Sequence, residues 1–128
     1  MDWSLYPNFK RKEFECHEHG ECIMHPQFMN LLQEIRENYG KPMIISSGYR
    51  CRNHSLEIIK DKPGEHTYGL AADILVHGRD AIELLYQALD HGVCRIGISQ
   101  RGDIKKRFIH LGLGNEYTSI FKPAIWTY

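Results

Sequence analysis

The sequence lacks a net charge, since its 128 residues carry 16 Lys and Arg against 16 Asp and Glu. A balanced charge produces no large field that would draw the chain to nucleic acid or to an anionic membrane. The one basic cluster, Lys105-Lys106-Arg107, lies between Gly102 and Phe108, and we interpret it as a solvated hairpin tip. A long hydrophobic run is also missing, as none approaches the ~18–20 residues that span a bilayer. We therefore expect no nucleic-acid partner and no membrane partner.

The N-terminus lacks the features of a secretory signal, because Met1–Pro7 contains no basic stretch followed by an apolar one. We therefore expect the chain to be synthesised as a soluble cytoplasmic protein. The sequence leaves the oligomeric state open, and we take a monomer as the starting hypothesis.

Cysteine is scarce, and no two cysteines form a C-x-x-C pair. A disulfide framework is not expected in a chain that has a core and no signal, although four cysteines are present: Cys16, Cys22, Cys51 and Cys94. The segment with Cys16, His17, His19 and Cys22 leaves two interpretations open. Its two thiolates and two imidazoles are the ligands of a second, tetrahedral metal site, or the segment is a reduced, partly buried loop.

The remaining pattern predicts one α+β domain over residues 1–128. Apolar residues at spacings of three and four predict two helices, Pro26–Tyr39 and Arg79–Asp90. We expect the second helix to bury a face made of Ile82, Leu85, Tyr86 and Leu89. Four strands are predicted at Met43–Ser47, Leu70–Val76, Arg95–Ser99 and Phe108–Leu113. Because the last two strands are neighbours in the chain, we expect a small antiparallel sheet with the helices packed on one face.

Two polar residues stand inside apolar strands, and a third precedes one of these strands. Asp73 lies inside a predicted strand, where a carboxylate is costly to bury unless it is paired or coordinated. His66 precedes that strand, and His110 lies in the middle of another. Two imidazoles and one carboxylate are a normal catalytic zinc set that leaves a fourth position for water. Two alternatives remain open: Asp73 caps a turn or pairs with Arg50, or the three residues form a hydrogen-bonded core network without metal.

Several motifs occur in one order along the chain: Ser47-Gly48-Tyr49-Arg50, then Asn53, then His66-Thr67-Tyr68-Gly69-Leu70-Ala71-Ala72-Asp73, then Phe108-Ile109-His110, and the ending Ala124–Tyr128. In these motifs the sequence resembles the zinc peptidases that include D-Ala-D-Ala carboxypeptidases and phage L-alanyl-D-glutamate endopeptidases. It is most similar to the short carboxypeptidase-like form of phages and bacteria. The resemblance runs over nearly the whole chain, and its H-x6-D segment is the specific part.

The resemblance implies a function and a set of site residues. His66, Asp73 and His110 would bind one Zn²⁺ in a cleft, and Arg50 would hold the substrate carbonyl or carboxylate. Substrate-binding residues would be Ser47, Tyr49 and Asn53. The implied substrate is a peptidoglycan stem peptide, cut at a D-Ala-D-Ala or an L-Ala-D-Glu bond. A phage-encoded chain would act at the cell wall, and the sequence does not distinguish a phage from a bacterial origin.

The chain departs from the family pattern at two glycines. Gly64 stands where many relatives have serine, and Gly112 stands where the short form often has aspartate, so a carboxylate near the metal is missing. Asp103, seven residues before His110, is the candidate general base, with a turn-forming role as its alternative. Glu65 is the other candidate, and its alternatives are to orient His66 or to face solvent.

The missing carboxylate leaves a second function open, that of a non-catalytic zinc-binding domain serving as a wall-peptide binder or virion component. The other histidines are expected to be exposed, and one of them, His54, has the alternative of approaching the cleft: His17, His19, His25, His54, His77 and His91.

Overall fold

The fold is α+β, as the sequence predicts. The computed structural model describes residues 1–114 and 120–128, which contain four α-helices and a five-stranded sheet. The helices are α1 (Arg11–Phe14), α2 (Pro26–Tyr39), α3 (Ser55–Ile58) and α4 (Gly78–Asp90), and the short 3-10 helices are η1 (Trp3–Leu5), η2 (Glu65–Tyr68) and η3 (Ile104–Lys106). The strands are β1 (Ile44–Ser47), β2 (Ala71–Leu75), β3 (Arg95–Ser99), β4 (Phe108–Gly112) and β5 (Ala124–Thr127).

The sheet has the strand order β1-β2-β4-β3-β5. The four predicted strands pair antiparallel, in agreement with the expectation. The tail adds a fifth strand, β5, which pairs parallel to β3 and makes the sheet mixed. Gly112 at the end of β4 and Ala124 at the start of β5 both lie opposite Arg95. Strand β4 thus ends and β5 begins at the same end of the sheet, so β5 runs antiparallel to β4 and parallel to β3.

Helix α2 ends where the sequence predicts. The His25 side chain caps its first turn by accepting a hydrogen bond from the Gln27 backbone at 3.2 Å. At the other end Gly40 has a φ of 75°, the left-handed conformation that glycine adopts without strain. One side of the helix is buried in the core, through Phe28, Met29, Leu32, Gln33 and Ile35.

The predicted buried face of α4 is wrong in three of its four residues, since only Leu85 packs against the core. Ile82, Tyr86 and Leu89 are 71%, 64% and 58% exposed, and the helix instead buries Ala81, Leu84 and Ala88. Alanine has the smallest side chain that a helix can present, so this stripe lets α4 approach its neighbours closely. Ile82, Tyr86 and Leu89 lie on the exposed sides of the helix. The spacing of apolar residues in the sequence does not distinguish such positions from core positions.

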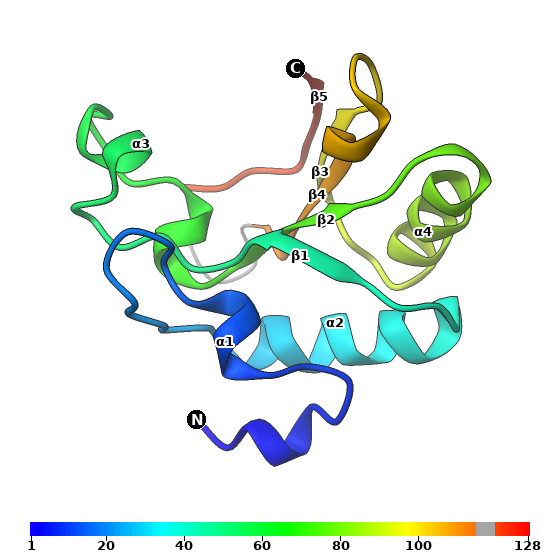
Figure 1. Ribbon diagram of the computed structural model, residues 1–128, viewed down its shortest axis with the longest axis horizontal. Helices are drawn as coiled ribbons and strands as arrows, with labels where there is room; N and C mark the ends of the chain where they lie inside the picture. The colour runs from blue at the N-terminus through cyan, green and yellow to red at the C-terminus, as the bar shows by residue number, and fades with distance from the viewer. Residues whose placement is uncertain (115–119) are drawn as a thin grey trace.

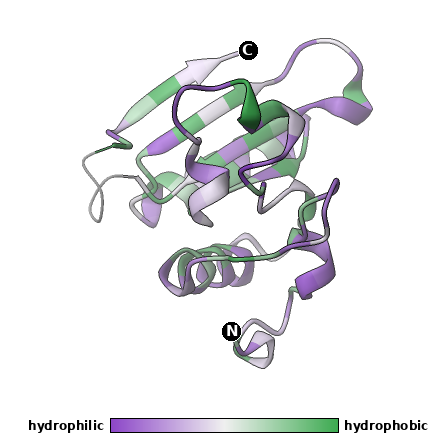
Figure 2. Ribbon diagram, turned by 90° about the vertical axis from the view of Figure 1, so that its left-hand side faces the viewer, coloured by the Kyte–Doolittle hydropathy of each residue, from purple (hydrophilic) through white to green (hydrophobic). Residues whose placement is uncertain are grey.

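Helices α2 and α4 contact one another, and their buried residues share one hydrophobic core with one face of the sheet. That face presents Ile74, Ile96, Ile109 and Leu111, all at most 3% exposed. In Figure 1, α3 lies on the other side of the sheet from α2, and β5 forms the edge of the sheet beside β3. The strands in Figure 2 show the alternating hydrophobic and hydrophilic bands expected when one face packs on a core. Within the described part of the chain, no helix is long and apolar enough to cross a membrane.

Candidate metal centre and cleft

A single row of residues crosses the sheet on the face opposite to α2. In the strand register Asp73 on β2 faces His110 on β4, His110 faces Gly97 on β3, and Gly97 faces Trp126 on β5. Side chains alternate between faces along a strand, so these positions point away from the core-facing Ile74 and its neighbours. The register therefore brings an imidazole, a carboxylate and an indole together from three separate strands.

The three predicted ligand residues gather at this row. His66, Asp73 and His110 are buried, and each offers one ligand atom within 4.8 Å of the others. Oδ1 of Asp73 lies 2.9 Å from Nδ1 of His110 and 3.5 Å from Nε2 of His66. These two ring nitrogens are therefore the ones that face the centre of the group.

The outward nitrogen of His66 is also held. Its Nδ1 lies 2.8 Å from the carbonyl oxygen of Gly48, which accepts its hydrogen bond and leaves Nε2 directed at Asp73. Gly48 approaches the N-terminal segment so closely that a Cβ there would lie 2.7 Å from Cα of Phe14. The glycine of the Ser47–Arg50 motif is therefore required for space, and its backbone orients His66.

The charges of the group are strongly coupled. Burial by itself would raise the pKa of Asp73, but hydrogen bonds with His110 and His66 lower it well below its usual range. Burial by itself would lower the pKa of His110, but hydrogen bonds with Asp73 and Glu65 raise it. An anionic carboxylate between two imidazoles is a donor set that suits a divalent cation, and zinc above all.

Arg50 lies beside this group and is held from three sides. Its Nη2 donates to Oδ2 of Asp73 at 3.5 Å, its Nε to Oγ of Ser47 at 3.2 Å, and its Nη1 to Oε2 of Glu57 at 3.4 Å. The Arg50 side chain is 18% exposed, so the guanidinium still reaches the surface of the cleft. Ser47, predicted to bind substrate, is thus placed to fix the arginine.

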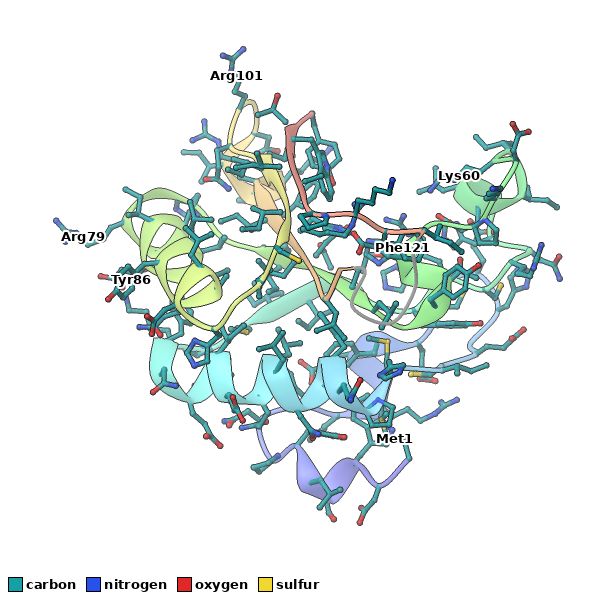
Figure 3. The ribbon with its side chains drawn as sticks, turned by 180° about the vertical axis from the view of Figure 1, so that it is seen from behind. Met1, Lys60, Arg79, Tyr86, Arg101 and Phe121 are labelled. Carbon is teal, nitrogen blue, oxygen red and sulfur yellow. The ribbon has the colours of Figure 1, made fainter. Side chains whose placement is uncertain are left out.

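A cleft of about 480 Å³ opens over the group. Trp126 lies along it, with its ring centroid 5.0 Å from that of His110 and 5.1 Å from the Arg95 guanidinium carbon. A Cβ at Gly97 would lie 2.7 Å from Cε2 of Trp126, so the indole lies over β3 because that position has no side chain. The cleft is lined by Arg50, Leu56, Ile59, Lys60, Gly64, Glu65, His66, Asp73, Arg95, Phe108, His110, Trp126 and Tyr128. Figure 3 shows Lys60, which follows α3 in the chain, and Phe121, which lies on the stretch that leads into β5.

The sequence model of the Peptidase M15 family matches residues 7–112 of the chain. The chain belongs to the Peptidase M15 family. A comparison with curated proteins gave no match. M15 peptidases are zinc-dependent in general, and the His-Asp-His group of this member is able to hold a metal. The matched range contains His66, Asp73, His110 and Arg50 and ends before β5, so it does not include Trp126.

Three other residues predicted for the M15 site lie elsewhere. Tyr49 is 6% exposed and belongs to the hydrophobic core. Asn53 is exposed, and its backbone oxygen lies 3.4 Å from Nε2 of His19. Asp103 is exposed at the N-terminus of η3, where its side chain accepts a hydrogen bond from the Lys105 backbone at 3.0 Å. The position of Asp103 therefore agrees with its turn-forming alternative. Tyr49, Asn53 and Asp103 are not among the residues that line the cleft.

Two acidic residues of the site were missed or underrated. Glu65 is 4% exposed and contacts His110, so it neither faces solvent nor orients His66. Glu57 was not singled out, and its side chain is 1% exposed. Its apolar neighbours Leu56 and Ile58 are 50% and 63% exposed. A segment that exposes its apolar residues and buries its acid inverts the usual pattern, so sequence reasoning had no signal for Glu57.

The segment with Cys16, His17, His19 and Cys22 forms no second metal group among residues 1–114 and 120–128. Sγ of Cys16 instead lies 3.5 Å from Sγ of Cys51. His54 corrects another expectation, because it is 9% exposed. Its Nδ1 accepts the Leu56 backbone hydrogen bond that caps α3, so it supports the helix rather than the cleft.

Proposed function

We propose that this member of the M15 family is a zinc-dependent peptidase that hydrolyses peptidoglycan stem peptides. The observation that carries the proposal is the convergence of His66, Asp73 and His110 in a cleft, each with a donor atom facing the others. The two imidazoles belong to different elements, η2 and β4, so only the tertiary fold brings them together.

The proposed zinc ligands are Nε2 of His66, a carboxylate oxygen of Asp73 and Nδ1 of His110. Zinc bound by such a set acts as a Lewis acid and lowers the pKa of its water to about 7. Gly48 supports this arrangement, because its carbonyl holds the outward nitrogen of His66.

Arg50 is the proposed electrophilic group. Its guanidinium would hold the carbonyl oxygen of the substrate and stabilise the negative charge that develops there. Ser47 and Glu57 fix the guanidinium in place before substrate arrives, which removes the cost of ordering a long side chain. Arg50 is thereby preorganised at the rim of the group that binds the metal.

The charges of the cleft support an anionic peptide as substrate. Arg50 and Lys60 both line it, and the Lys60 side chain is 43% exposed. Stem peptides of peptidoglycan carry free carboxylates, which pair with such cations. The same chemistry suits a terminal D-Ala-D-Ala and an L-Ala-D-Glu bond, so both belong to the proposal. The proposed site of action is the cell wall, which a phage-encoded chain reaches after release from its host.

The test combines metal analysis with a hydrolysis assay. Wild-type protein, His66→Ala, His110→Ala and the control His17→Ala, at an exposed histidine, are analysed for zinc and incubated with defined stem peptides. We expect about one zinc per chain and peptide products, seen by mass spectrometry, in the wild type and the control alone. A wild-type protein without zinc, with both His→Ala variants equally stable, would refute the proposal.

A second candidate function is a zinc-bearing domain that binds wall peptides without cutting them. It is favoured by the pairing of both carboxylates that line the cleft. Asp73 contacts His66, His110 and Arg50, and Glu65 contacts His110 and Arg95. Within residues 1–114 and 120–128, the cleft lining therefore offers no unpaired acid for proton transfer. Calorimetric binding of a stem peptide without product would select this candidate.

A further inference from the structure

The side chain of Glu65 lies on the outer side of His110. One carboxylate oxygen, Oε1, contacts Nε2 of His110, and the other, Oε2, accepts a hydrogen bond from Nε of Arg95 at 3.0 Å. The side chain is 4% exposed, so both oxygens are committed to partners within the protein. Arg95 in turn packs against the ring of Trp126, which keeps its guanidinium in place.

Gly112 provides the space for this carboxylate. A Cβ built at Gly112 would lie 2.7 Å from Cδ and 2.7 Å from Oε1 of Glu65, closer than real side-chain contacts allow. The φ of Gly112 is not positive, so the position needs a glycine for room and not for backbone conformation. The Glu65 carboxylate, which comes from η2, thus occupies the space that a side chain at position 112 would fill.

The two imidazoles of the group are then held in the same way. Each has one nitrogen toward Asp73 and the other against an acceptor, which is the Gly48 carbonyl for His66 and the Glu65 carboxylate for His110. An outer acceptor fixes the tautomer and the ring orientation of a metal-binding histidine and makes its inner nitrogen a better donor. For His110 the outer acceptor is Glu65, the residue that precedes His66 in the chain.

We propose that Glu65 is a positioning residue that holds His110 through Nε2 and directs Nδ1 at the metal, in the space left by Gly112. The inference rests on the proposed function, since it requires that the His-Asp-His group binds zinc. It assigns Glu65 no role as the general base, because a base needs a free oxygen at the substrate.

The experiment measures zinc affinity by competition with a chromophoric chelator. The proteins are the wild type, Glu65→Gln, Glu65→Ala, Gly112→Asp, the double variant with Glu65→Ala and Gly112→Asp, and Glu34→Ala as an exposed control. Loss of an outer-shell partner weakens metal binding by about 10–100-fold, which we expect for Glu65→Ala. Glu65→Gln keeps an acceptor and loses less, and the control is unchanged. Gly112→Asp alone weakens binding because its side chain displaces Glu65, whereas the double variant binds more tightly than either single variant.

A second measurement does not depend on the stability of the variants. Long-range ¹H–¹⁵N spectra of the zinc-loaded wild type should show the His110 proton on Nε2 and the metal on Nδ1. Metal on Nε2, or a Glu65→Ala protein that binds zinc as tightly as the wild type, would overturn the inference and leave the zinc site intact. A wild-type protein that binds no zinc would overturn the proposed function itself, and this inference with it.

Discussion

Replacement of Glu57 by glutamine tests how the fold holds Arg50. The Glu57 side chain is 1% exposed and accepts hydrogen bonds from Lys60 at 2.9 Å, the Gly64 backbone at 2.8 Å and Thr67 at 3.3 Å, besides Arg50. Burial by itself would raise the pKa of this carboxyl. The hydrogen bonds from Lys60 and Gly64, with the charges of Lys60 and Arg50, lower the pKa to about 2.

The size of the expected change in the free energy of unfolding follows from the linkage between proton binding and folding. A carboxyl whose pKa is depressed on folding stabilises the protein above its unfolded pKa, here 4.5, and loses that contribution as the pH falls through about 2. The interval between these values, at about 1.4 kcal/mol per pH unit, corresponds to about 3 kcal/mol at pH 7. By the same relation, Glu57 still contributes about half of this stabilisation at pH 3.

The assay is urea unfolding followed by circular dichroism, at pH 7, 4.5 and 3. We expect Glu57→Gln to lower the free energy of unfolding by about 3 kcal/mol at pH 7, and the difference from wild type to shrink to about half at pH 3. Because other carboxylates titrate in the same range, the difference between the two proteins isolates Glu57. Glu34→Gln, at an exposed position of α2, is the control and should follow the wild type. A difference that stays constant from pH 7 to pH 3 would refute the reasoning.

Three further predictions follow from the cleft and the motif glycine. Arg50→Lys should lower the turnover of a stem peptide by about 10²–10³-fold, since it removes a fixed oxyanion donor; its zinc content should match that of the wild type, and unchanged turnover would contradict the role. Zinc titration should change the tryptophan fluorescence because Trp126 lies against His110, and the change should persist in Trp3→Phe and vanish in Trp126→Phe. Gly48→Ala should lower the free energy of unfolding by about 1–3 kcal/mol in denaturant titration, because its Cβ would overlap the Phe14 backbone; a variant as stable as the wild type would show that the loop moves freely.

Much of the fold and part of the site could be predicted from local patterns. The bounds of α2 and β3 follow from apolar spacing and end signals, and both match the structure. Asp73 and His110 were recognisable because a carboxylate or an imidazole in an apolar strand needs a partner. The family resemblance then implied that they bind zinc together with His66. Residues whose roles depend on distant neighbours were not predictable in this way. Tyr49 and Asn53 sit in or near a recognisable motif, yet one is in the core and the other is exposed.

The sequence by itself determined which elements form and which residues are able to bind a metal, because helix and strand periods and the cost of burying charge are local properties. Only the tertiary structure decided which acids serve the site. Glu65 reaches His110 because η2 lies against the end of β4, where Gly112 has no side chain, and 45 residues separate the two in the chain. Trp126 reaches the same histidine because β5 joins the sheet beside β3. Such contacts depend on the register of the strands and on the room left by residues without side chains. The spacing of residues along one segment predicts neither.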